Sequence, residues 1–380
     1  MQIDTRQIQE TNAYSCLECG KCTGTCPVAR YSNTFSPRQI LTSSLQNTHP
    51  DAIRPADLWS CLTCMRCDEV CPSDIKYTDF IHLIRQFKGI ENREGTCSHG
   101  GILESISRIM MAPNLKQQRL NGLDNDFQTS TNSEYLYFMG CLPYFDVLFT
   151  DIGVNSLNIA RNTLKILNYF GIKPQLLPNE KCCGHDSYWN GDVKTFQTLA
   201  LANIEQIKKA KVKKIITSCP ECYRTLRIDY PNNFGSQDFE VFHISEFLDE
   251  IFADKKPNLK SDEQKMTFQD PCRLGRHMGI YEPPRQVIRS ISGIDLSEMG
   301  HHHKRSICCG VSGWMNCSQV SKQIQANRLH EAKATGAEVL VTSCAKCQIH
   351  FKCAMHEEKL GQEISIEIKD LTEVVGESLQ

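Results

Sequence analysis

Two short stretches of this sequence place adjacent cysteines directly before a glycine: KCCGHDSYWNG at 181–191 and ICCGVSGWMN at 307–316. Neighbouring cysteines pair poorly with each other, because a disulfide between adjacent residues is strained. The chain holds 21 cysteines among 380 residues. Where thiols stay reduced, so many cysteines indicate metal or redox chemistry rather than a disulfide framework.

The first third of the chain contains two runs of four cysteines, each followed by proline. Both runs read C-x-x-C-x-x-C-x-x-x-C-P, the spacing of bacterial two-cluster ferredoxins, in which the fourth cysteine of a run binds the other cluster. We therefore predict one cubane 4Fe–4S cluster on Cys16, Cys19, Cys22 and Cys71. The second cubane cluster would be bound by Cys61, Cys64, Cys67 and Cys26. Zinc knuckles are the alternative, but zinc favours separated pairs of ligands, often with histidine.

The other patterned cysteines form an internal repeat, with five cysteines in each copy. The first copy has Cys141, Cys182, Cys183, Cys219 and Cys222, and the second has Cys272, Cys308, Cys309, Cys344 and Cys347. Corresponding positions are offset by 131, 126 and 125 residues. Five thiolates are one more than a cubane requires, and they fit a cluster that has been opened or split. An ordinary cubane or a zinc ion in one or both copies is the alternative.

This arrangement resembles the catalytic subunit of heterodisulfide reductases, either the D type or its fused C and B equivalent. The signature is the CCG motif, C-x(31–39)-CCG-x(35–36)-C-x-x-C, present twice after a two-cluster ferredoxin. The resemblance covers nearly the whole chain, although the first spacer, at 40 residues, is slightly longer than usual, and the spacers after the two CCG stretches, at 34 and 33 residues, are slightly shorter. It implies one noncubane 4Fe–4S cluster on the five cysteines of each copy.

The resemblance also implies a reaction at these cysteines. A disulfide would be reduced by two electrons, or formed in the reverse direction, between the two noncubane clusters. The cubane clusters would feed the electrons singly, and Cys182, Cys183, Cys308 and Cys309 would carry the catalysis. His185 could donate a proton, with a packed, hydrogen-bonded histidine as an equal alternative.

Arginine and histidine follow Cys272 closely and could bind an anionic substrate tail. The three residues are Arg273, Arg276 and His277. Bidentate arginine suits such a tail, but arginines that simply lie at the surface are the more common outcome.

A second function stays open, that of an electron-transfer subunit with no disulfide substrate of its own. Similar subunits belong to complexes of the glycolate or glycerol-3-phosphate dehydrogenase type and the benzoyl-CoA reductase type. The sequence shows no flavin or nucleotide fingerprint, so we expect a redox partner: a flavoprotein, a hydrogenase-type protein or a membrane cytochrome. So many clusters also imply anaerobic handling.

Charge and hydropathy indicate which kinds of partner and which location to expect for the protein. The net charge of −2 does not favour nucleic acid. No apolar run approaches the roughly 18–20 residues that span a bilayer. The opening residues lack the apolar segment of a signal peptide. We therefore expect a cytoplasmic protein, held at a membrane only through a partner.

These cysteines need a scaffold that brings them together. We predict an α/β protein with a helical ferredoxin-like domain at 1–98, a linker at 99–133, and CCG domains at 134–260 and 261–380. Strand and helix patterns alternate in each copy, which predicts small parallel sheets flanked by helices. The predicted strands are EYLYFMG, KPQLLP, KKIITS, KMTFQD and EVLVTS. Most of them deliver a cysteine at the carboxyl end, where ligands gather in such sheets.

Further expectations concern single segments. Pro37, after a Ser36 cap, should start a helix, and YTDFIHLIRQFKG at 77–89 should form another that ends at its glycine. Gly184 and Gly310 should let the backbone approach a cluster closely. We expect buried walls at Trp189 and Trp314, packing by Met110 and Met111, and an exposed loop at 301–303. The default for Cys97, Cys317 and Cys353 is a buried thiol.

Overall fold

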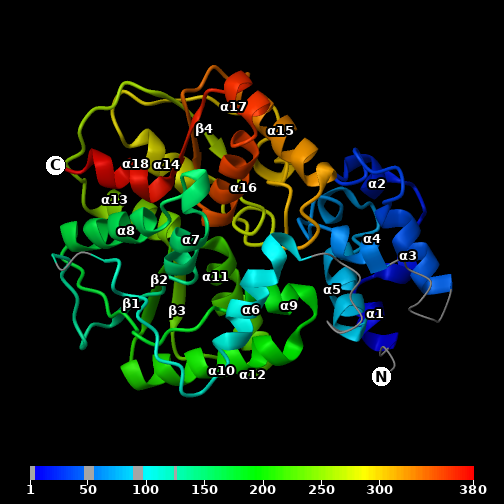
Figure 1. Ribbon diagram of the computed structural model, residues 1–380, viewed down its shortest axis with the longest axis horizontal. Helices are drawn as coiled ribbons and strands as arrows, with labels where there is room; N and C mark the ends of the chain where they lie inside the picture. Colours follow the sequence, from blue (N-terminus) through cyan, green and yellow to red (C-terminus); the bar gives the residue numbers. More distant parts are fainter. Residues whose placement is uncertain (1–4, 47–54, 89–96, 124–125) are drawn as a thin grey trace.

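A computed structural model describes residues 5–46, 55–88, 97–123 and 126–380. The N-terminal part, blue in Figure 1, lies to one side of a larger body that contains both copies of the cysteine repeat. Among the described helices, none is both long enough and apolar enough to cross a membrane.

Helices dominate the N-terminal part. They are α1 (Thr5–Glu10), α2 (Lys21–Thr25), α3 (Pro37–Gln46), α4 (Pro55–Ser60) and α5 (Tyr77–Lys88). The predicted start of α3 at Pro37 is confirmed, and Ser36 Oγ accepts a hydrogen bond from Gln39 N at 3.3 Å. The expected stop at Gly89 lies outside the described residues. Helix α6 (Ile102–Ile109) follows in the segment predicted as a linker.

The first copy of the repeat is built on a parallel sheet with the strand order β1-β2-β3. Its strands are β1 (Tyr135–Tyr137), β2 (Lys214–Thr217) and β3 (Glu240–His243). The helices are α7 (Leu142–Leu148), α8 (Leu157–Tyr169), α9 (His185–Asn190), α10 (Val193–Ala210), α11 (Pro220–Arg224), α12 (Tyr230–Phe234) and α13 (Ile244–Asp254). The predicted strand KPQLLP is reduced to a bridge between Gln175 and Leu136. Its prolines, Pro174 and Pro178, cannot donate to a ladder.

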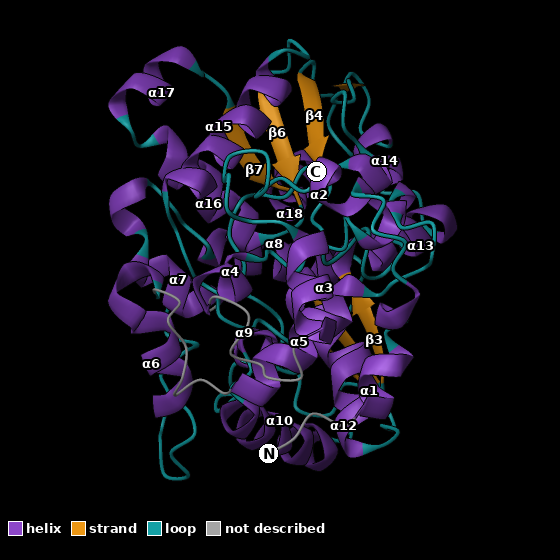
Figure 2. Cartoon of the chain, turned by 90° about the vertical axis from the view of Figure 1, so that its right-hand side faces the viewer, coloured by secondary structure: helices purple, strands orange, loops and turns teal. Residues whose placement is uncertain are grey.

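The second copy repeats this plan with an added edge strand, in the order β5-β4-β6-β7, again all parallel. The strands are β4 (Lys265–Gln269), β5 (Asp295–Leu296), β6 (Val339–Thr342) and β7 (Glu367–Asp370). The helices are α14 (Glu282–Arg289), α15 (Gln319–Lys333), α16 (Ala345–Met355), α17 (Glu358–Glu363) and α18 (Leu371–Ser378). Figure 2 shows β4, β6 and β7 side by side with helices around them.

The two copies pack together through one pair of helices from each. Helix α8 of the first copy contacts α18 of the second, and α13 contacts α14. These helices share one apolar core, which includes Ile159, Phe252, Val287 and Val374. The predicted α/β fold class is confirmed. Burial of this shared core makes the two copies one body, because separating them would expose apolar surface on both.

Candidate iron–sulfur centres

Two cavities in the N-terminal part are lined by the predicted cubane ligands. The first is lined by Cys16, Cys19, Cys22, Cys67 and Cys71. The second is lined by Cys26, Cys61, Cys64 and Cys67. The fourth cysteine of each run thus lies beside the first three of the other run. Four sulfurs around one small cavity are the ligand set that a 4Fe–4S cluster needs.

The two cavities differ in exposure. Cys19 of the first set is exposed, and the nearby apolar side chains of Leu17 and Tyr14 are 70% and 55% exposed. In the second set Cys61 and Cys64 are buried, and burial raises the pKa of Cys61 to about 11. The first cavity therefore lies at the surface of the N-terminal part, and the second lies inside.

In the first copy of the repeat the five cysteine sulfurs lie together. Cys141 Sγ donates to Cys182 Sγ at 3.5 Å, and Cys222 Sγ donates to Cys183 Sγ at 3.5 Å. Cys219, one turn before Cys222, hydrogen-bonds to it. Thiol hydrogen bonds from Cys141 and Cys183 hold the pKa of Cys182 well below its usual value.

The second copy gathers its own five cysteines in the same way. Hydrogen bonds join Cys272 to Cys308, and Cys347 to both Cys309 and Cys344. Hydrogen bonds from Cys308 and Cys347 lower the pKa of Cys309 to about 6. Here a histidine joins the sulfurs, because His350 Nδ1 lies 3.3 Å from Cys309 Sγ. Each copy therefore offers five convergent sulfurs, a donor set that fits an iron–sulfur cluster.

The glycines around these sulfurs have roles that differ from the expectation. Gly184 and Gly310 adopt φ of 85° and 88°, and a Cβ there would meet Phe196 Cδ2 at 2.9 Å and Ser321 O at 2.8 Å. They are needed for a left-handed turn against a neighbouring helix. The glycine that makes room for a sulfur is Gly140, where a Cβ would lie 2.7 Å from Cys222 Sγ.

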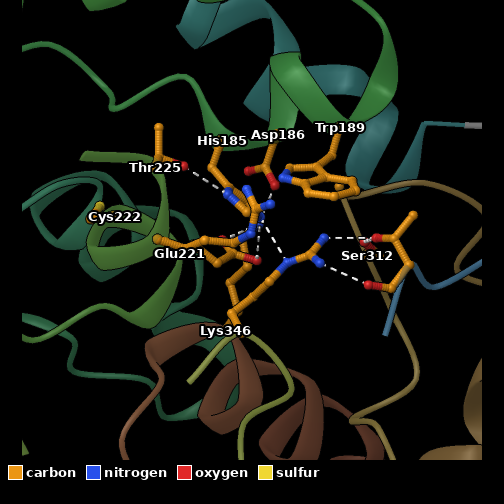
Figure 3. Close-up of polar contacts among 12 residues, drawn as sticks. His185, Asp186, Trp189, Glu221, Cys222, Thr225, Ser312 and Lys346 are labelled. Atoms are coloured by element: carbon orange, nitrogen blue, oxygen red, sulfur yellow. Dashed lines mark hydrogen bonds and ion pairs between the residues drawn. The ribbon is translucent and has the colours of Figure 1, made fainter. Parts of the chain in front are cut away.

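A buried ion cluster connects the two sets of five cysteines (Figure 3). Lys346 Nζ contacts Glu221 Oε2 at 2.7 Å and also Asp186 Oδ1. The Lys346 side chain is 7% exposed. Burial opposes its charge, but Asp186 and Glu221 outweigh this effect and raise the pKa of the ammonium well above its usual value. Lys346 lies between Cys344 and Cys347, so the contact joins the two ligand loops directly.

His185 also lies in this cluster, buried among polar partners. Its Nε2 accepts a hydrogen bond from Arg273 Nε at 3.0 Å, so Nδ1 carries the proton and donates to Thr225 Oγ1 at 2.9 Å. Burial, followed by the charge of Arg273, lowers the pKa of His185 well below its usual value. The geometry therefore favours a packed, neutral histidine over a proton donor.

The residues considered for an anionic substrate tail contact the second ferredoxin run instead. Arg273 donates to Thr63 O and Thr63 Oγ1, both at 2.7 Å. Arg276 Nε donates to Cys64 O at 2.5 Å, and His277 Nε2 lies 2.9 Å from Thr63 O. Their donors hold the backbone carbonyls of Thr63 and Cys64 within the second cysteine run, and all three residues are substantially buried.

Several side chains support the centres in ways that the sequence did not predict. Met110 Sδ accepts from Cys182 N at 3.2 Å. Arg85 donates to Cys61 O at 2.7 Å and to Trp189 O at 3.0 Å, which ties the N-terminal part to the first copy. No sequence pattern indicated these roles. Lys346 had a signal, because it faces Glu221 at the equivalent position of the other copy with the opposite charge.

The remaining single-segment expectations have mixed outcomes. Trp189 and Trp314 are buried, as predicted, at 1% and 2% exposed. The prediction of an exposed loop at 301–303 is wrong, because these histidines are half-buried. His301 Nδ1 lies 2.8 Å from Glu331, and His303 Nε2 lies 2.7 Å from Glu282. Cys317 is exposed, whereas Cys97 and Cys353 are partly buried.

Comparison with family models identifies three domains. A cysteine-rich CCG domain matches twice, at residues 135–227 and 266–352. A 4Fe-4S dicluster domain matches residues 12–75. Together these matches include every cysteine of the four ligand sets described above.

Curated relatives carry the same resemblance. The chain is 32% identical over 277 residues to the D-type subunit of the dihydromethanophenazine:CoB--CoM heterodisulfide reductase of Methanosarcina mazei. This match covers 70% of this chain and 64% of the relative, so the chain spans less than two thirds of the relative's length. The B-type subunit of the fumarate reductase (CoM/CoB) of Methanothermobacter marburgensis is 26% identical, with 98% of this chain and 73% of the relative covered.

Other similarities extend to quinone-linked proteins and to one solved structure. The EtfAB:quinone oxidoreductase of Syntrophomonas wolfei is 30% identical over 65% of this chain and 34% of its own length. A hypothetical protein from Helicobacter pylori has a crystal structure that aligns over 98% of this chain and 71% of its own, with a TM-score of 0.52 at 12% identity. The latter supports the fold alone.

Proposed function

Because this chain belongs to the iron–sulfur proteins that join a 4Fe-4S dicluster domain to two cysteine-rich CCG domains, and is related to the D-type subunits of heterodisulfide reductases, we propose that it is a disulfide-reducing oxidoreductase subunit. The reaction is the two-electron reduction of a small disulfide to two thiols, or its reverse. A redox partner subunit exchanges the electrons.

One observation carries the proposal: both copies keep a complete set of five converging cysteines, and the buried Lys346 cluster joins the two sets. A disulfide takes up two electrons, whereas bound iron–sulfur clusters would supply them one at a time. Two complete sets that share one contact region match this requirement. In this proposal each set of five holds a noncubane cluster, and each ferredoxin set of four holds a cubane.

The chain's own residues perform three tasks in this proposal. The ten thiolates of the repeat hold the two clusters. Lys346 fixes the two ligand loops against each other and places a positive charge between sets of negatively charged sulfurs. Neutral His185 holds Arg273, which in turn holds the carbonyl of Thr63 inside the second ferredoxin run.

The order of the centres supports entry of electrons through the N-terminal part. Cys61 and Cys64 share one apolar core with Cys308 and Cys309 of the second copy. The pair Cys182 and Cys183 belongs to a different core. Arg276 spans the junction, because it donates to Cys64 O at 2.5 Å and to Ser306 O at 2.7 Å. We propose that the second copy receives electrons before the first.

The experiment uses the anaerobically purified chain with a reduced viologen dye and a panel of small disulfides. The expected result is dye oxidation that depends on a disulfide and disappears in the Cys183→Ala/Cys309→Ala double variant. Cys317→Ala is the matched control, because this exposed cysteine lies outside every motif. The same rate in the double variant and the wild type would refute the proposal.

A second candidate is an electron-transfer subunit without a disulfide substrate, favoured by the similarity to a quinone oxidoreductase at 30% identity. The same preparation decides between the two. Full cluster content with rapid dye-to-quinone or dye-to-flavoprotein transfer, and no reaction with any disulfide, would favour this candidate.

A further inference from the structure

Tyr77 lines both cavities of the N-terminal part. Tyr77 is the first residue of α5 and is 3% exposed. One cavity is that of Cys16, Cys19 and Cys22, and the other contains Cys61. Among the described residues, its buried hydroxyl has no hydrogen-bond partner.

A buried hydroxyl without a partner destabilises the folded state, so native proteins rarely leave one unpaired. The groups around this one are sulfurs. Tyr77 is buried in the same apolar core as Cys61 and Cys64 of the second predicted set. No cysteine of the first predicted set is among the buried members of that core. We therefore expect the hydrogen-bond acceptor of the Tyr77 hydroxyl to belong to the cluster that the second set would bind.

The position of Tyr77 is fixed by its neighbours. Asp68, next to Cys67, accepts from Thr78 N at 3.2 Å and from Thr78 Oγ1 at 3.0 Å. On the other side, Lys76 N donates to Thr11 O at 2.9 Å. These contacts fix the backbone on both sides of Tyr77, to the second cysteine run through Asp68 and to Thr11 ahead of the first run.

We propose that Tyr77 donates its hydroxyl proton to a sulfur atom of the cubane cluster held by Cys26, Cys61, Cys64 and Cys67, and so raises the reduction potential of that cluster. The inference rests on the proposed binding of cubanes by these cysteines. A hydrogen bond to a cluster sulfur favours the reduced form, because reduction adds negative charge to the cluster. Tyr77 thereby makes the inner cubane a better electron acceptor than it would be without this hydrogen bond.

The test compares Tyr77→Phe with the wild-type chain. Phenylalanine keeps the ring and removes only the donor. Tyr137→Phe is the matched control, since this buried tyrosine bonds Ser218 Oγ at 2.9 Å, away from the N-terminal cavities. Midpoint potentials come from redox titration followed by EPR. The Cys19→Ser variant, which changes a ligand of the other set, assigns each signal to its cluster.

The expected result is an unchanged iron content and a lower potential for the inner cubane in Tyr77→Phe. A tenfold change in the one-electron equilibrium corresponds to a shift of about 59 mV. Tyr137→Phe should leave both potentials unchanged. In the wild type in D₂O, pulsed EPR of the reduced inner cubane should detect an exchangeable deuteron coupling that Tyr77→Phe lacks, in addition to any from the Thr63 amide, which donates to Cys61 Sγ at 3.4 Å in both proteins.

Unchanged potentials in an iron-replete Tyr77→Phe protein would overturn the inference. If the variant loses iron, the wild-type measurement decides, and the lack of any exchangeable deuteron coupling to the inner cubane beyond that of the Thr63 amide overturns it. These outcomes are separate from failure of the proposed function, which would appear as missing N-terminal iron or as no reaction with disulfides while the Tyr77 effect persists.

Discussion

In the first copy of the cysteine repeat the chain after the vicinal pair forms helix α9 from His185 onward, whereas in the second copy it turns back through a bridge between Ser312 and Met315. The polar residues near the cysteines differ as well. The first copy supplies Asp186 and Glu221, and the second supplies Lys346. Glu221 and Lys346 occupy equivalent positions of the repeat and carry opposite charges, so the copies attract each other where two identical residues would repel.

The last helix of each copy shows the same divergence. Both helices start with a capping box, but His243 caps α13 and Asp370 caps α18. Burial lowers the pKa of His243 to about 3 and raises that of Asp370 to about 7. The two copies therefore share one backbone plan, but their buried capping groups should change the stability of the protein with pH in opposite directions.

The largest expected effect comes from removing one vicinal cysteine in either copy. Cys183→Ala and Cys309→Ala should each lose about four iron atoms per chain and lower disulfide reduction by about a hundredfold or more, since a ligand is missing. Iron analysis and the viologen assay measure both. If one of the two variants keeps full activity, the copies are not used together.

Breaking the contact between the copies should have a smaller effect than removing one of these cysteines. Lys346→Met leaves two buried carboxylates without a counter-ion, which should destabilise the protein by about 3–5 kcal/mol. Lys352→Met is the matched control: Lys352 lies on the same helix and also reaches the first copy, at Gly153 O, 2.8 Å away, but at the surface. It should cost no more than about 1 kcal/mol.

The triple variant Asp186→Asn/Glu221→Gln/Lys346→Met sharpens this test, because it leaves no unpaired charge. Much of the lost stability should return in anaerobic melting experiments. A triple variant that is less stable than Lys346→Met would show that the charges themselves are not what joins the copies.

The two helix caps should give opposite pH profiles. Asp370 binds a proton more tightly in the folded state, so its contribution to stability falls as pH rises from about 4 to about 7. The free energy of unfolding of Asp370→Asn should therefore exceed that of the wild type by on the order of 2 kcal/mol at pH 8 and should equal it near pH 4. His243 binds its proton more weakly when folded, so His243→Asn should gain only as pH falls below about 6.5. Melting temperatures between pH 5 and pH 8 check this, and parallel profiles for the two variants would contradict it.

The smallest effect concerns the histidine that only the second copy places beside its sulfurs. His350→Phe removes the contact with Cys309 Sγ and should change the EPR signature of that copy, with a rate change within about tenfold. Thr225→Val, at the equivalent position of the first copy, should leave the second-copy signature as it is. Identical spectra for His350→Phe and the wild type would show that His350 does not make the second copy differ from the first.

Much of this molecule could be predicted from local patterns. The helix that starts at Pro37 and the strands at 135–137, 214–217, 265–269 and 339–342 follow from caps and apolar runs, which act within a few residues. Strands β3 and β7 were missed because EVFH and EIKD mix charged and apolar residues and start at an exposed position, so neither forms an apolar run. The strand expected at 173–178 failed because proline weakens a ladder that the apolar residues alone suggested.

The sequence by itself determined which thiols could hold clusters, because ligand spacing is a covalent property of a short segment. It also determined that the repeat occurs twice. Only the tertiary structure decided what Lys346, Arg273 and Tyr77 do. Lys346 meets an aspartate 160 positions away, and Arg273 meets a carbonyl 210 positions away. Such contacts form only where segments distant in the sequence pack together, because a buried charge or polar group depends on a specific partner only once water has been excluded.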